Sequence, residues 1–448
     1  MRQIRRQLKV GLIWSVLVAL GVFTVLVVVK PTQPTKWEDK HAPRNRSGLL
    51  MTTAQTPAPV HRPQNQFPSR LYLTRVRMYA EAERYLKNVP HNTTHRQELD
   101  IMKVRIYEPD AEFTSPCRWV EHVPENNCPD AEAPLKKALT WSSPERGKIL
   151  RCLPYFFLAG VNKCGTSTLF FRIQKHPDVT PHAIKETKWI NRHRLFPFCS
   201  SIETYLDYLQ LTSSFIQSKY RQGEVSPYVI GDGTPSYLST NDFWDMMPGN
   251  EGCKEPCVTN ADIIHHLNPR ARLIIILRNP TTRLYSSYFQ KAKLYRSKVS
   301  KQGFHDLVVK EIANFKTCLT SQSFRGCCYN YSLSNSFTEA LDVRRGIYHV
   351  FMSDWMKLFP RDQIHVIKFE DYIKNEKTHL AEIFKFLKLR NLSDEDLENI
   401  ANMKPANQRH YGAEVGDMLN STRDLIDRFY KPHNDEFSIL MKNKYWNW

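Results

Sequence analysis

The chain has 448 residues, of which 41% are hydrophobic, and its formal net charge is +18. This length accommodates one large domain with appended segments. A globular protein this basic usually binds a polyanion, such as nucleic acid, an anionic membrane or a sulfated glycan, and the simpler alternative is that the charge serves solubility alone.

The first informative segment is an uncharged apolar run at residues 10–29. About 20 apolar residues span a bilayer core, whereas a cleaved signal peptide has a shorter core and a small-residue cleavage site. Four cations precede the run, at Arg2, Arg5, Arg6 and Lys9, and they favour a cytoplasmic N-terminus. We therefore expect a cytoplasmic tail at 1–9, a transmembrane signal anchor at 10–29 and a lumenal remainder. That topology strongly disfavours nucleic acid as the partner.

A proline-rich stretch follows the expected anchor. Residues 31–68 hold seven prolines and few apolar residues, which predicts a disordered stem at 30–70. Residues 71–146 have a mixed pattern, with an amphipathic run at 71–86, and we expect an extension packed on the main domain. Lumenal exposure agrees with glycosylation triplets at Asn45, Asn92, Asn330, Asn391 and Asn420.

Ten cysteines also agree with an oxidising compartment. Cys253 and Cys257 are close in sequence, and Cys327 and Cys328 are adjacent. A zinc site is the alternative, but a second Cys or His pair at zinc-finger spacing is missing. The sequence favours disulfides over a metal and leaves their connectivity open.

The main domain is expected at 147–448. Apolar runs predict strands at 155–159, 228–230, 272–277 and 364–369, and helical patterns predict helices at 166–175, 202–213, 281–294, 338–358 and 418–430. Strands that alternate with helices indicate an α/β fold with a parallel sheet covered by helices on both faces. Ligands of such sheets bind beyond the carboxyl ends of the strands.

The loop after the first of these strands is typical of a phosphate site. Gly160 and Gly165 bracket a Gly-Xaa4-Gly turn, and Thr166, Ser167 and Thr168 open the next helix with hydroxyl and N–H donors. Nucleoside triphosphatases place a lysine directly after the second glycine. Here the lysine, Lys163, lies inside the loop, and a ligand-free turn is the simpler interpretation.

A second cationic motif follows the strand at 272–277. Arg278 stands at the carboxyl end of that strand, and Ser286 lies more than a turn into the following helix. Arginine binds phosphate with two parallel hydrogen bonds, and serine adds a hydroxyl donor. Arg283 is a further cation. Alone, the motif would indicate only a helix start with surface arginines.

Together the two motifs resemble those of sulfotransferases that use 3′-phosphoadenylyl sulfate (PAPS). Gly-Val-Asn-Lys-Cys-Gly-Thr-Ser resembles their 5′-phosphosulfate loop, including Cys164, and Leu-Arg-Asn-Pro-Thr-Thr-Arg-Leu-Tyr-Ser resembles their 3′-phosphate motif. The resemblance covers roughly 150–445 and is strongest to the Golgi glycosaminoglycan branch. It implies a P-loop-like parallel sheet flanked by helices, PAPS as donor without a metal, and a lumenal catalytic domain of a single-pass type II Golgi membrane protein.

The resemblance also implies a base. In the glycosaminoglycan branch a glutamate at a Lys-Glu position takes the acceptor proton, which corresponds to Glu186. Lys185 and Lys188 flank it and are expected to favour its carboxylate and to bind acceptor sulfates. His182 is a further candidate, since cytosolic members use histidine. Thr187 departs from the proline expected there, and a solvated surface glutamate is the simpler interpretation.

Two further segments match less closely. Asp232 and Tyr237 lie in Gly-Asp-Gly-Thr-Pro-Ser-Tyr-Leu, which resembles a segment that lines the acceptor cleft. The alternative is a plain loop rich in glycine and proline. Arg409 and Gly412 occupy the place of the C-terminal cofactor loop, although the usual Lys/Arg-Gly pattern is not matched cleanly.

These resemblances imply sulfuryl transfer to a glycosaminoglycan, in particular to the 6-hydroxyl of N-acetylgalactosamine 4-sulfate in chondroitin or dermatan sulfate. The alternatives are a heparan sulfate or other glycan acceptor, tyrosine sulfation, a catalytically dead glycan-binding protein, and a P-loop ATPase or kinase. The kinase would need a magnesium-binding aspartate after an apolar strand, and the candidate strand is interrupted by Lys368. The sequence leaves open whether the chain is a homo-oligomer.

Overall fold

The computed structural model describes residues 82–88, 97, 99–121, 123, 128, 147–181, 183–196, 199–295, 297–330, 341–406 and 411–448. All described residues belong to one compact unit, which lies within Gln64–Trp448. The expected tail, anchor and stem lie outside the described residues, as do Asn45 and Asn92. Within the described ranges, no helix combines the length and apolar character that crossing a membrane requires.

A four-stranded parallel sheet forms the centre of this unit, with the order β4-β3-β5-β6. Its strands are β3 (Phe156–Gly160), β4 (Gly231–Asp232), β5 (Arg272–Leu277) and β6 (Ile364–Lys368). The apolar runs of β3 and β5 are buried almost throughout because helices cover the sheet. The predicted α/β fold is confirmed, but the strand expected at 228–230 is wrong: the ladder to β3 begins only at Gly231.

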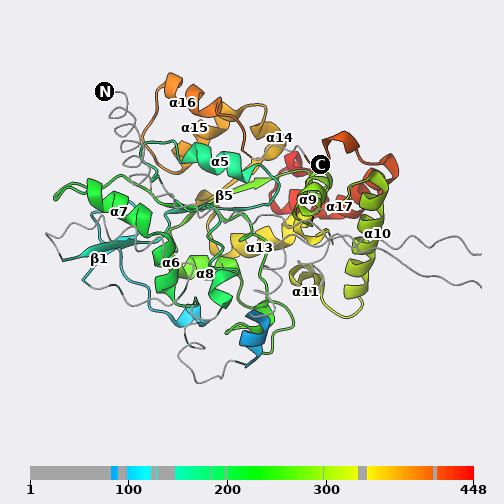
Figure 1. The fold of residues 1–448 in the computed structure, drawn as a ribbon, viewed down its shortest axis with the longest axis horizontal. Helices are drawn as coiled ribbons and strands as arrows, with labels where there is room; N and C mark the ends of the chain where they lie inside the picture. The colour runs from blue at the N-terminus through cyan, green and yellow to red at the C-terminus, as the bar shows by residue number, and fades with distance from the viewer. Residues whose placement is uncertain are drawn as a thin grey trace, which may run out of the picture. The chain divides into compact units, whose positions relative to one another are not determined.

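Helices lie on both sides of the sheet in Figure 1. On one side of β5 lie α5 (Thr166–Ile173), α15 (Glu376–Phe386) and α16 (Asp394–Ala401); on the other lie α6 (Ile202–Tyr208), α8 (Asn260–Leu267) and α13 (Tyr348–Leu358). The helix expected at 202–213 is in fact two, because the chain breaks at Leu209 before α7 (Gln210–Lys219). Further α-helices of the described residues are α9 (Pro280–Tyr295), α10 (Lys301–Cys318), α11 (Phe324–Tyr329), α14 (Phe369–Tyr372) and α17 (Asn420–Leu440).

The segment before the main domain is tied to it covalently. β1 (Cys117–Val120) pairs antiparallel with β2 (Ile149–Cys152), and a disulfide joins Cys117 to Cys152. The other disulfides are Cys128–Cys199, Cys253–Cys257 and Cys318–Cys327, which leaves Cys164 and Cys328 as buried thiols. The preference for disulfides is therefore confirmed, and the antiparallel pair β1–β2 was not predicted.

Candidate active site

A cavity of about 610 Å³ opens where β3, β5 and β6 end. Its lining comes from the loop after β3 and the start of α5, from Arg278 and α9, from α14 with the residues after it, and from residues 405, 406 and 411. The structure thus brings Lys163, Gly165, Thr166, Ser167, Thr168, Glu186, Arg278 and Ser286 to one cavity. This is the edge at which parallel α/β sheets bind their ligands.

The loop after β3 takes a shape that only a few residues allow. Gly165 has φ +77°, and a Cβ there would come within 2.7 Å of Phe369 Cε2, so the position requires glycine. Lys163 also has a positive φ, of 73°, which costs backbone energy at a non-glycine residue. Burial and the neighbouring Arg278 charge lower the pKa of Lys163. The loop therefore holds a lysine and the N-terminus of α5 at the cavity wall.

Cys164 differs from its neighbours in the loop. Its side chain is fully buried, and burial raises the pKa of the thiol to about 12. Cys164 is not among the residues that line the cavity, so the structure gives no support for a contact between its thiol and a ligand there.

Arg278 reaches the cavity from the end of β5. Its Nε donates to Thr282 Oγ1 at 3.0 Å, its Nη1 donates to the Lys163 carbonyl at 3.4 Å, and its guanidinium carbon lies 5.0 Å from the centre of the Phe369 ring. These contacts fix the guanidinium beside the loop. Arg283 does not join it, because its buried side chain donates to the Asp342 carbonyl at 3.0 Å.

The α9 side of the cavity contains residues that sequence reasoning missed. Ser286, Gln290 and Lys293 follow one another at intervals of four and three residues, which places them on one helix face. That spacing is visible in the sequence and would have been enough to predict Gln290 and Lys293.

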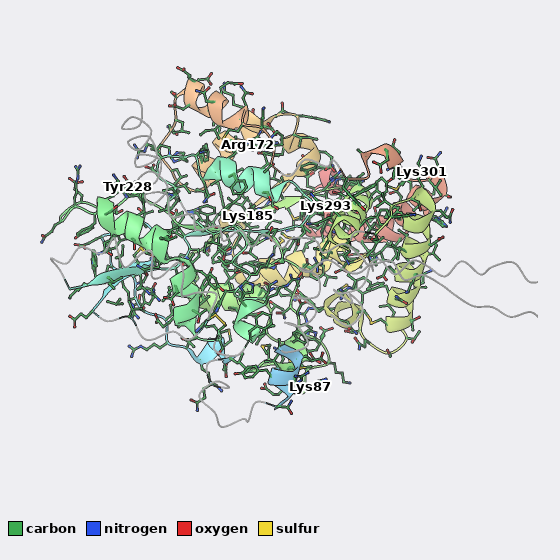
Figure 2. All side chains as sticks on the ribbon, viewed as in Figure 1. Lys87, Arg172, Lys185, Tyr228, Lys293 and Lys301 are labelled. Carbon is green, nitrogen blue, oxygen red and sulfur yellow. A yellow bond between two sulfur atoms is a disulfide. The ribbon has the colours of Figure 1, made fainter. Side chains whose placement is uncertain are left out.

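Other parts of the cavity region come from separate segments. Figure 2 shows Lys293 and Lys185 on separate segments of the molecule. Phe369, Tyr372, Ile373 and Glu376 were also missed, although they follow the end of β6.

Glu186 lies at the cavity with both carboxylate oxygens already paired. Lys185 Nζ is 2.7 Å from Oε1, and Lys188 Nζ is 2.8 Å from Oε2. Burial alone would raise the pKa of Glu186, but the Lys188 and Lys185 charges outweigh it and lower the pKa to about 2. Glu186 and Lys188 have positive φ values of 65° and 51°, so this loop is strained and needs support from elsewhere.

That support comes from Asp232, which is fully buried at the end of β4. Its Oδ2 accepts from the hydroxyls of Thr187, Tyr205 and Tyr237 at 2.8, 2.8 and 3.1 Å, and its Oδ1 accepts from Thr234 at 2.6 Å. Burial raises the pKa of Asp232 above its usual value, although the four hydroxyl donors oppose this shift.

The Asp232 network also explains the local geometry of the glutamate loop. The Glu186 amide donates to the Gly233 carbonyl at 3.2 Å, so the backbone of the loop is fixed as well. Asp232 and Tyr237 were candidate substrate contacts, but the structure buries both and does not bring either to the cavity. Thr187, where a proline was expected, supplies the hydroxyl that ties the loop to Asp232.

Five other candidate residues are not among the described residues that line the cavity. Two of them, Lys185 and Lys188, pair with Glu186 but do not themselves line the cavity. His182 and Arg409 lie outside the described residues. Gly412 has φ +69° and packs against Phe289, so it shapes the region beside Tyr411 but is not itself among the lining residues. No group of three or more potential metal ligands occurs among the residues that the structure describes.

Comparison with known proteins places the chain in a family. The model described as "Sulfotransferase domain" matches residues 153–408, more than half of the chain. Carbohydrate sulfotransferase 15 of Homo sapiens is 32% identical over 319 residues, which cover 67% of this chain and 55% of that protein. The chain therefore spans about half the length of the curated relatives it matches.

Two more distant similarities were found. The bifunctional heparan sulfate N-deacetylase/N-sulfotransferase 2 of Homo sapiens is 21% identical over 69% of this chain and 33% of its own length. A solved sulfotransferase structure from Alicyclobacillus acidocaldarius aligns with a TM-score of 0.42 and 20% identity, over 66% of this chain and 98% of its own. On the strength of the family match to residues 153–408, the chain belongs to the sulfotransferase domain family.

Proposed function

We propose that the cavity binds PAPS and that the protein transfers its sulfuryl group to a hydroxyl of a glycosaminoglycan sugar. The observation that carries this proposal is the meeting of an anion-cradling loop, a strand-end arginine and a paired glutamate in one cavity of about 610 Å³. Membership of the sulfotransferase domain family supports it.

The two phosphate-bearing ends of PAPS fit two parts of the cavity. The N–H groups and hydroxyls at Gly165–Thr168, with Lys163, suit the 5′-phosphosulfate because a helix N-terminus favours an anion. Arg278 and Ser286 suit the 3′-phosphate, since the guanidinium can donate two hydrogen bonds to it. Lys293 adds a cation on the same helix face as Ser286.

The transfer is an in-line displacement at sulfur. The acceptor oxygen forms a bond to sulfur while the bond from sulfur to the 5′-phosphate oxygen breaks, and the electron pair of that bond remains on the phosphate. Lys163 and the loop donors stabilise this developing charge, and positioning supplies most of the remaining effect. Glu186 takes the proton of the acceptor hydroxyl.

For Glu186 to act as the base, its ion pairs with the two lysines must weaken when the acceptor binds. A carboxylate with a pKa of about 2 holds a proton weakly, and both of its oxygens are engaged by lysines. A sulfated acceptor competes for Lys185 and Lys188, which frees one oxygen and raises the pKa of Glu186 as the acceptor binds. The two lysines thereby link the presence of an anionic acceptor to activation of the base.

For the acceptor, we propose the 6-hydroxyl of N-acetylgalactosamine 4-sulfate in chondroitin or dermatan sulfate. Similarity to a carbohydrate sulfotransferase supports a glycan, and two lysines beside the base suit an acceptor that already carries a sulfate. The same resemblance supports a lumenal Golgi location behind the expected anchor at 10–29.

The test uses the full chain with radiolabelled PAPS and a panel of acceptors: chondroitin 4-sulfate, dermatan sulfate, desulfated chondroitin, heparan sulfate and a tyrosine peptide. We expect label on chondroitin 4-sulfate, at the 6-position by disaccharide analysis. Label only on heparan sulfate or on the peptide would refute the proposed acceptor but would support sulfuryl transfer from PAPS. Binding of glycans without any PAPS binding would overturn the reaction itself.

A further inference from the structure

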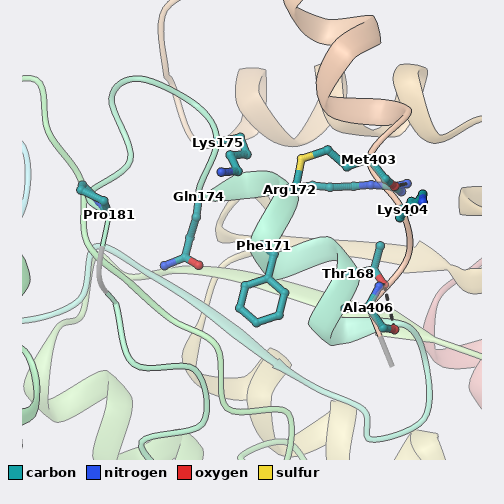
Figure 3. A pocket seen from close by; sticks show the side chains of 9 residues that line it. All are labelled: Thr168, Phe171, Arg172, Gln174, Lys175, Pro181, Met403, Lys404 and Ala406. Carbon is teal, nitrogen blue, oxygen red and sulfur yellow. Dashed lines mark hydrogen bonds between the residues drawn. The ribbon is translucent and has the colours of Figure 1, made fainter. Parts of the chain in front are cut away.

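A second cavity, of about 380 Å³, lies along α5 next to the first (Figure 3). Thr168 and Ala406 line both cavities, so the two share a wall. In Figure 3 the ring of Phe171 lies between Gln174 on one side and Thr168 with Ala406 on the other.

The walls of this second cavity are fixed by buried contacts. Arg172 donates to the Met403 carbonyl at 2.8 Å and to the Tyr372 hydroxyl at 2.9 Å, and it pairs with Glu376 at 2.6 Å. The Ala406 amide donates to Thr168 Oγ1 at 3.0 Å. The segment 403–406 is therefore held against α5 at two points, and the cavity is formed before any ligand arrives.

The chemistry of the lining suits an anionic sugar. Phe171 is 40% exposed, and Lys175 and Lys404 are both exposed. The described lining contains no carboxylate, and neither lysine forms an ion pair with another described residue. An exposed aromatic face packs against the C–H face of a sugar ring, and unpaired lysines attract its carboxylate or sulfate.

The second cavity is linked by a hydrogen bond to the loop that carries Glu186. Gln174 Nε2 donates to the Ala183 carbonyl at 3.4 Å, three residues before Glu186, so α5 and the glutamate loop are joined at this point. Because the Phe171 cavity adjoins both the first cavity and the glutamate loop, it is placed to contact a sugar of a bound glycan other than the one at Glu186.

Resting on the proposed function, we propose that the Phe171 cavity is a subsite for an acidic sugar of the acceptor chain, other than the sugar that receives the sulfuryl group. Phe171 supplies the packing surface, and Lys175 and Lys404 bind the carboxylate or sulfate of that sugar. The enzyme consequently prefers a polymer to a minimal acceptor.

The test compares kcat/KM for polymeric chondroitin 4-sulfate with kcat/KM for its disaccharide. In Phe171→Ala and in the Lys175→Ala/Lys404→Ala double variant, we expect the ratio of kcat/KM for polymer to kcat/KM for disaccharide to fall about tenfold, which corresponds to about 1.4 kcal/mol. Phe171→Tyr keeps the ring and should retain the wild-type ratio. Lys219→Ala removes an exposed lysine of α7 that lines neither cavity, and it controls for loss of net charge.

Two outcomes overturn the subsite. One is a polymer-to-disaccharide ratio that changes no more than in Lys219→Ala. The other is an equal loss for both acceptors together with weaker binding of adenosine 3′,5′-bisphosphate (PAP) by calorimetry, because the cavity would then serve the donor. Failure of the wild-type protein to modify any glycan would instead refute the proposed function, so the two failures are distinguishable.

Discussion

The donor side and the base side of the cavity are built in different ways. On the donor side, the loop after β3 and Arg278 after β5 are placed by the ends of two neighbouring buried strands. On the base side, Glu186 lies on a loop with two strained residues, and a buried carboxylate 46 positions later in the chain holds that loop through Thr187. A candidate binding loop can thus be recognised from local sequence, whereas the position of the glutamate proposed as the base depends on distant buried polar contacts.

The largest effect is expected on the donor side. Replacing Lys163 with alanine should lower kcat by about 10³, because one preorganised donor to a developing oxyanion contributes a factor of this order. The measurement is turnover with saturating labelled PAPS and chondroitin 4-sulfate, with PAP affinity measured in parallel. Turnover within tenfold of wild type would show that the leaving phosphate is stabilised elsewhere.

On the base side, Glu186→Gln should lower kcat by about 10², since general-base catalysis contributes at least this factor. PAP binding should remain close to wild type, because the loop donors and Arg278 are untouched. Calorimetry with PAP and turnover assays separate the two effects. Wild-type turnover in this variant would refute the assignment of the base.

Thr187→Val tests the support of the glutamate loop, because it removes the hydrogen bond from Thr187 to Asp232 without replacing any residue that lines the cavity. We expect kcat to fall about tenfold without a change in PAP affinity, because a displaced catalytic group loses rate through misalignment. Thr187→Ser should restore most of the rate, since it keeps the hydroxyl that donates to Asp232 at 2.8 Å. A parallel loss of thermal stability and activity in both variants would indicate only a folding defect.

The smallest effect concerns pH. Because the folded-state pKa of Glu186 is lowered from 4.5 to about 2, its lysine pairing is fully present above about pH 4.5 and is lost only as the pH falls toward 2. Wild-type kcat/KM, which reports the free enzyme, should therefore show no decline from this group between pH 7 and 4. Lys188→Met removes the larger of the two lysine charge effects and should raise the pKa of Glu186.

The measurement is kcat/KM against pH, with circular dichroism at each pH to confirm folding. In Lys188→Met we expect kcat/KM to begin to decline at a higher pH than in the wild type, because the Glu186 carboxylate takes up a proton more readily without that lysine. Identical profiles for the two proteins would contradict the role of Lys188 in holding the carboxylate charged.

Much of the donor side could be predicted from the sequence. The apolar runs before Lys163 and Arg278 mark buried strands, and parallel strands place the residues at their carboxyl ends along one edge of the sheet. The helix spacing of Ser286, Gln290 and Lys293 carried the same kind of local signal.

The base side could not be predicted in the same way. Asp232 was interpreted as a substrate contact because its segment resembles one that lines the acceptor cleft, yet four hydroxyls from Thr187, Tyr205, Thr234 and Tyr237 satisfy it in the interior. Thr187, Tyr205 and Tyr237 are separated from Asp232 by 45, 27 and 5 residues in the sequence. Only the tertiary fold brings them together.

The most direct test of the proposed donor site is a crystal structure of the protein with PAP bound. We predict the 5′-phosphate on the backbone N–H groups at Gly165–Ser167 with Lys163 Nζ in contact, and the 3′-phosphate on Arg278 and Ser286. A 5′-phosphate that contacts neither the loop nor Lys163, or PAP bound away from this cavity, would contradict the proposal.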